Sequence, residues 1–149
     1  MSGAPKLSEV LLRGSIAGVV MFAIGALFHW LLPIVAPSIA ALYGLPPFRP
    51  LLGWPLYYFI AHPFWFGLAF AWLFTVLEPR KRTTLAGARF GAALFLVGAL
   101  PVYLLCFASI AIPRPVVVCW LLQGLTQYVL AGAALGGRHV GPRSSTPIP

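Results

Sequence analysis

The chain has 149 residues, of which 60% are hydrophobic and only 8% are charged, a composition far outside the range of soluble globular proteins. Two acids, Glu9 and Glu78, stand against ten Lys and Arg residues, and the formal net charge is +8. No acid lies inside an apolar segment, so the sequence gives little support to a carboxylate proton relay or an acid/base pair. The basic residues are not interleaved with stacking aromatics, which argues against a nucleic-acid partner.

Four apolar segments are each close to the length of about 20 residues that a helix needs to cross the hydrocarbon core of a bilayer. Because these runs are long and continuous, they favour helices over the short alternating strands of a membrane barrel. The predicted fold class is an all-α membrane protein, an antiparallel bundle of four transmembrane helices in a domain of residues 14–137. The predicted spans are 14–35, 54–77, 85–112 and 115–135, with a segment 1–13 before them and a tail 138–149 whose composition is typical of disorder.

The basic residues are unevenly divided between the connections. Only Arg49 and Arg114 lie in the first and third connections, whereas eight lie before the first span, around the second connection or after the fourth span: Lys6, Arg13, Arg80, Lys81, Arg82, Arg89, Arg138 and Arg143. By the positive-inside rule, this bias predicts a multi-pass protein of the inner (plasma) membrane with both termini in the cytoplasm. The first span is longer than the apolar region of a signal peptide, so we expect it to be retained.

Two connections carry structural signals of their own. The outer connection 36–53 is rich in proline, and its segment SIAALYG predicts a short interfacial helix that ends at Gly44. The third connection contains Ile-Pro-Arg-Pro at 112–115, which forces a reversal because proline cannot continue a helix. The third and fourth spans are therefore expected to be antiparallel neighbours.

Small residues recur four positions apart in three of the spans. This spacing places two glycines on one helix face and lets the backbone of another helix approach closely. Together the pairs favour a tightly packed bundle or an oligomer. They are Gly14 with Gly18, Gly87 with Gly91, and Gly132 with Gly136.

The polar residues of the spans are predicted to share one depth in the membrane. At 1.5 Å per residue, His29 lies roughly 9 Å and His62 roughly 12 Å below the outer ends of their helices. Cys106 and Cys119 fall in the same slab, and Gln123 lies next to them. His29 follows Gly14, Gly18 and Gly25 on one face, while Cys119, Gln123 and Gln127 form a stripe on the fourth span, so both sets are expected to face protein rather than lipid.

One interpretation of the two histidines is a cofactor site. Neutral imidazoles from two antiparallel helices can bind haem b iron axially, and a (bacterio)chlorophyll magnesium needs one of them. Gly25, one turn before His29, would leave room for a flat macrocycle, and Arg49 and Arg114 could pair with propionates. The sequence contains no Cys-x-x-Cys-His motif, so a haem would be held non-covalently.

Two other interpretations remain open. His29 and His62 can be structural residues that bond a tyrosine, a carbonyl or Gln123, and the two cysteines can behave as small hydrophobes. Alternatively, the stripe of Gln123 and Gln127 could line a small oligomeric channel or transporter.

No catalytic motif is present, so we expect a non-enzymatic protein. The function that the sequence favours most is a small accessory or scaffold subunit of a larger membrane complex or a homo-oligomer. Its expected partners are membrane lipid and other transmembrane subunits or copies of itself, contacted through the glycine pairs and the aromatic-rich span 54–77.

Overall fold

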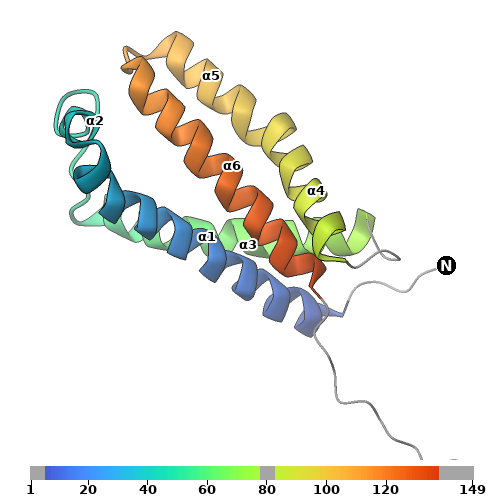
Figure 1. Ribbon diagram of the computed structural model, residues 1–149. Coiled ribbons are helices and arrows are strands. Elements are labelled where there is room, and N and C mark those ends of the chain that lie inside the picture. The colour runs from blue at the N-terminus through green and yellow to red at the C-terminus, as the bar shows by residue number, and fades with distance from the viewer. Residues whose placement is uncertain (1–5, 78–82, 138–149) are drawn as a thin grey trace, which may run out of the picture.

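The computed structural model describes residues 6–77 and 83–137, and every element in these ranges is a helix (Figure 1). Four helical segments are long and apolar enough to span a membrane. They are α1 (Leu7–Val35), α3 (Trp54–Leu77), the continuous run of α4 (Thr84–Leu94), η1 (Phe95–Ala99) and α5 (Leu100–Ser109), and α6 (Arg114–Gly136). The predicted all-α fold with four transmembrane helices is therefore confirmed.

The helix ends differ from the predicted spans by more than one residue at two places. α1 begins at Leu7 rather than at residue 14, because Glu9 in its first turn suits the positive end of the helix dipole. The third segment ends at Ser109 rather than at 112, since Ile110 already has an extended backbone ahead of Pro113. Residues 1–5, 78–82 and 138–149, which include the predicted tail, lie outside the described residues.

α1 and α3 form an antiparallel hairpin that crosses at three glycines. A Cβ at Gly14 would lie 2.7 Å from the Cα of Leu68, and one at Gly18 would lie 2.9 Å from the Cα of Phe64. Gly67 of α3 meets the backbone of both α1 glycines. Only residues without a side chain permit this backbone approach, so these glycines set the closeness of the first hairpin.

The second hairpin, formed by α4 and α6, crosses in the same way. A Cβ at Gly87 would meet the carbonyl of Gly132 and would lie 2.9 Å from the nitrogen of Gly136, while one at Gly91 would meet the carbonyl of Tyr128. All three predicted glycine pairs are thus packed inside a single chain. The antiparallel arrangement predicted for the third and fourth spans is confirmed.

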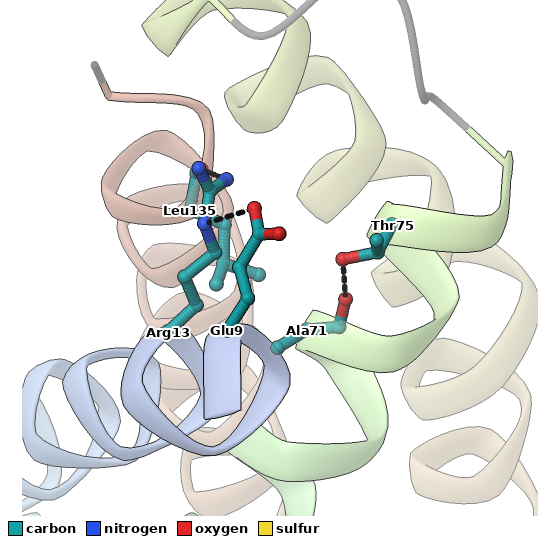
Figure 2. A network of polar contacts seen from close by, with 5 residues as sticks. All are labelled: Glu9, Arg13, Ala71, Thr75 and Leu135. Atoms are coloured by element: carbon teal, nitrogen blue, oxygen red, sulfur yellow. Dashed lines mark hydrogen bonds and ion pairs between the residues drawn. The ribbon is translucent and has the colours of Figure 1, made fainter. Parts of the chain in front are cut away.

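The two hairpins pack against each other at the end where α1 begins and α6 ends. Arg13 of α1 donates from Nη1 to the carbonyl oxygen of Leu135 in the last turn of α6 at 3.2 Å, and its Nε pairs with Oε1 of Glu9 at 3.2 Å (Figure 2). A cation suits the negative end of a helix dipole. The apolar core at this junction includes Ala17, Met21, Phe70, Phe74, Tyr128, Ala131 and Leu135.

Toward the opposite end the two hairpins diverge (Figure 1). The predicted interfacial helix is present there as α2 (Pro37–Leu42). α2 and the following loop pack on the first turns of α6, where Ile39, Leu42 and Phe48 pack against a second apolar cluster that contains Val116 and Val117. This cluster bridges the gap between the ends of the two hairpins.

Candidate ligand-binding cavity

A cavity of about 620 Å³ lies between the hairpins where they diverge. One wall comes from α1 beyond Gly25 and from α3 around His62. The other wall comes from α5 and from the first half of α6, and the end is formed by α2 and the loop that follows it. The volume falls in the range of about 300–1,000 Å³ that is typical of small-molecule and cofactor sites.

Most of the polar residues singled out in the sequence line this one cavity. It brings together His29, His62, Arg49, Cys106, Cys119 and Gln123. Arg114 does not line it: this residue opens α6 and is exposed. Of the two arginines proposed as propionate partners, the structure places only Arg49 at the cavity, where its guanidinium also lies 5.5 Å from the centre of the Trp54 ring.

His62 is hydrogen-bonded within its own helix. Pro63 has no backbone N–H, so the carbonyl of Phe59 loses its usual helical donor. The His62 ring takes that place, with Nδ1 at 3.1 Å from the Phe59 oxygen and 3.2 Å from the Tyr58 oxygen. α3 continues unbroken through Pro63, which is buried against α1.

His29 lines the cavity from α1, the helix next to α3 on the same wall. Gly14, Gly18 and Gly25 on the same face of α1 are buried, whereas His29 is exposed because the hairpins have separated at this level. Its ring centre lies 6.3 Å from that of Phe59, and the Phe59 ring lies 6.3 Å from that of His62. Both histidines thus contact one aromatic ring on the same wall.

The amide stripe of α6 turns toward α1 of the same chain. Gln127 donates from Nε2 to the carbonyl oxygen of Met21 at 2.8 Å. A Cβ at Gly25 would lie 3.0 Å from the same Nε2 and 3.6 Å from Nε2 of Gln123. Gly25 therefore accommodates two amides of α6 and also borders the cavity.

Aromatic side chains that the sequence analysis did not select close the end of the cavity. Tyr43 packs on Phe48 with ring centres 5.1 Å apart, and Phe48 meets the edge of Trp120 at 6.0 Å. Burial, with a smaller contribution from Cys119, raises the pKa of the Tyr43 phenol above 10.0, and a hydrogen bond with Trp120 partly offsets the rise. Both cysteines are free thiols.

The third span contains a π-helical turn, η1, that the sequence analysis did not predict. Pro101 lacks the N–H that would bond four residues back, and its ring crowds the preceding turn. A π-helical turn widens the helix at such a point. Pro101, which lies inside the predicted span 85–112, is the feature of the sequence that could have indicated this π-helical turn. After this turn, α5 presents Val102, Tyr103 and Cys106 to the cavity.

The charge of the cavity is positive or neutral. Its lining includes no Asp or Glu, whereas Arg49 lies at its edge. Among the described residues, no group of three or more His, Cys, Asp and Glu side chains is arranged to hold a bare metal ion. The arrangement suits a lipophilic ligand that carries negative charge or that brings its own metal.

We compared the chain with protein-family models, characterised proteins and solved structures. None of the three comparisons gives a match. The interpretation of the cavity therefore depends on its own geometry and chemistry.

Proposed function

We propose that the protein is a non-enzymatic integral membrane protein that holds a lipophilic ligand of cofactor size between its two hairpins. The observation that carries this proposal is the cavity of about 620 Å³, which gathers polar and aromatic side chains from α1, α3, α5, α6 and the loop after α2. Exposure of polar side chains to lipid is unfavourable in free energy. A ligand that occupies the cavity would shield this cluster of polar side chains from lipid and give them hydrogen-bonding partners.

The charge bias of the connections supports a location for this site. Among the described basic residues, Lys6, Arg13 and Arg89 lie toward the end where α1 begins and α6 ends, and the cavity lies at the other end. With both termini in the cytoplasm, the cavity would open within the outer half of the inner membrane. A ligand would then enter sideways from the bilayer or from the outer surface.

Two valines of equal exposure provide a matched test. Val102 is 54% exposed and lines the cavity, whereas Val118 is 53% exposed and does not. Val102→Trp should fill the space, and Val118→Trp adds the same ring to another surface. After purification in lipid nanodiscs, solvent extracts analysed by mass spectrometry should show about tenfold less of one lipophile for Val102→Trp only, which corresponds to about 1.4 kcal/mol of binding free energy. Equal extracts from both variants would refute the proposal.

A role as a subunit of a larger complex is a second candidate, and it is compatible with ligand binding. The glycine pairs are occupied within the chain, so a partner would have to contact other residues. α3 offers an aromatic surface: Tyr57, Tyr58, Trp65 and Trp72 are 74%, 69%, 74% and 52% exposed. Native mass spectrometry after extraction into nanodiscs checks this role, and a uniform single-chain mass would count against it.

A further inference from the structure

The hydrogen bonds of His62 determine where the proton of its ring lies. Nδ1 is 3.1 Å from the Phe59 oxygen and 3.2 Å from the Tyr58 oxygen. Carbonyl oxygens only accept hydrogen bonds, so Nδ1 must carry the proton. In the neutral ring, Nε2 then has a free lone pair.

A nitrogen lone pair in a cavity can accept a hydrogen bond or bind a metal. Metal-binding histidines commonly donate their other N–H to a backbone carbonyl, which fixes the tautomer and the ring orientation. The His62–Pro63 pair produces that arrangement locally, since Pro63 frees the Phe59 carbonyl that receives the proton. Because unprotonated Nε2 cannot donate a hydrogen bond, it would make no polar contact with a ligand whose polar atoms are all hydrogen-bond acceptors.

The donor set of the cavity favours a metal inside a macrocycle over a bare ion. Zinc sites need three or four protein ligands, and the described residues contain no group of that kind. A tetrapyrrole supplies four nitrogens and leaves only one or two axial positions to the protein. Phe28, Phe59 and Trp120 line the cavity with flat apolar surface that suits such a ring.

Charge is consistent with a tetrapyrrole that carries carboxylates. No Asp or Glu lines the cavity, so propionate groups would meet no repulsion from its walls. Arg49 lies at the edge in the loop after α2, and an arginine can bind a carboxylate through two parallel hydrogen bonds.

We propose that the ligand is a metal tetrapyrrole of the haem type, bound axially through Nε2 of His62. This inference depends on the ligand-binding function proposed above. His62 is the metal ligand and Pro63 is a positioning residue that acts through the Phe59 carbonyl. His29, on the same wall and in contact with the same Phe59 ring, lies beside His62 and contributes a second polar group to the cavity.

The test compares two probes that differ only in the metal. The protein in lipid nanodiscs is titrated with ferric protoporphyrin IX and, separately, with metal-free protoporphyrin IX, followed by visible absorbance and by quenching of tryptophan fluorescence. For His62→Ala we expect at least about a tenfold loss of affinity for the iron porphyrin and loss of the ligation-induced band shift, with unchanged affinity for the metal-free ring. Tyr57→Ala on the same helix removes a ring outside the cavity and should leave both titrations unchanged.

Pro63→Ala tests the positioning role. Alanine restores a backbone N–H that competes with His62 Nδ1 for the Phe59 oxygen, so the imidazole loses its fixed orientation. We expect up to about a tenfold weaker affinity for the iron porphyrin, in the range seen when outer partners of metal ligands are removed. Affinity for metal-free protoporphyrin, measured in parallel, should remain at the wild-type value and shows that the fold is intact.

The outcomes separate this inference from the function on which it rests. If His62→Ala binds the iron porphyrin as the wild type does, or if neither porphyrin binds while Val102→Trp still lowers the extracted lipophile, metal ligation is overturned and the cavity remains a binding site. If Val102→Trp and Val118→Trp bind both probes equally well and give equal extracts, both proposals are overturned.

Discussion

Replacement of Gly87 by alanine tests the helix crossing that holds the second hairpin together. The new Cβ would lie 2.8 Å from the carbonyl carbon of Gly132 and 2.9 Å from the nitrogen of Gly136, where ordinary contact begins at 3.4 Å. Both neighbours are backbone, so no side chain can rotate away. The carbonyl oxygen of Gly132 lies nearer still, so α4 and α6 must separate by about 1 Å, and a gap of that size forfeits roughly half of the dispersion energy of each atom pair along the crossing.

Gly98→Ala is the matched control for this variant. Gly98 lies in the same span, and a Cβ there meets no atom within 4 Å. Both substitutions gain about 0.5–1 kcal/mol from the better helix propensity of alanine, so this contribution cancels in their difference. We expect Gly87→Ala to be less stable than Gly98→Ala by about 1–3 kcal/mol, the usual cost of overpacking.

Equilibrium unfolding gives the measurement. Each variant is held in mild-detergent micelles and unfolded by increasing the mole fraction of dodecyl sulfate, while circular dichroism follows helix content. Gly87→Ala should unfold at a clearly lower fraction than Gly98→Ala. Identical transitions would refute the reasoning, because they would mean that the backbone approach at Gly87 is not needed for stability.

Three further predictions concern individual contacts. Gln127→Leu removes the bond to the Met21 carbonyl and should lower the free energy of unfolding by about 0.6 kcal/mol, and by less than about 1.7. Arg13→Met removes the cation at the last turn of α6, where it bonds the Leu135 carbonyl, and should cost about 0.3–1 kcal/mol, less at high salt. Burial raises the pKa of the Tyr43 phenol above its ordinary value of 10.0. The neutral phenol therefore stabilises the folded state below pH 10, and this contribution to stability is lost as the pH rises through the raised pKa. Difference ultraviolet titration of the protein against Tyr43→Phe should place the ionisation of Tyr43 above pH 10.

Each of these predictions has its own control and its own contradictory result. Thr126→Val breaks a bond within one helix, to the Leu122 carbonyl, so it should change stability less than Gln127→Leu; the reverse order would contradict the first prediction. Arg13→Lys keeps a cation at the last turn of α6, so a loss as large as that of Arg13→Met would contradict the second. A Tyr43 phenol that ionises at or below pH 10 would contradict the third.

The depth of the polar residues could be predicted from the sequence, because helical rise and the order of the spans fix it. His29, His62, Cys106, Cys119 and Gln123 were expected at one level, and all of them line one cavity. The position of Arg114 could not be predicted in this way. It is the first residue of α6, and only the direction of the first turn decides that its side chain is exposed and away from the cavity.

Other features depend on how helices meet, which a single span does not reveal. Gly67 receives both glycines of α1 but has no glycine four residues away, so a search for glycine pairs misses it. The buried Ala71, four residues later, would have completed a pattern of small residues. The two amides beside Gly25 could not be predicted for a related reason, since they come from Gln123 and Gln127 of α6, about a hundred residues further along the chain.

The two glycine crossings also have a consequence for biogenesis. Each crossing joins helices that are consecutive membrane spans, α1 with α3 and α4 with α6, so each hairpin contains the contacts that define it. Neither crossing needs a contact from the other hairpin, so we expect the first hairpin to be able to close in the bilayer before α4 and α6 have been made. Met21, Phe70, Phe74, Tyr128 and Leu135 pack between the hairpins, and residues of both hairpins line the cavity, so the cavity is complete only when the two hairpins meet.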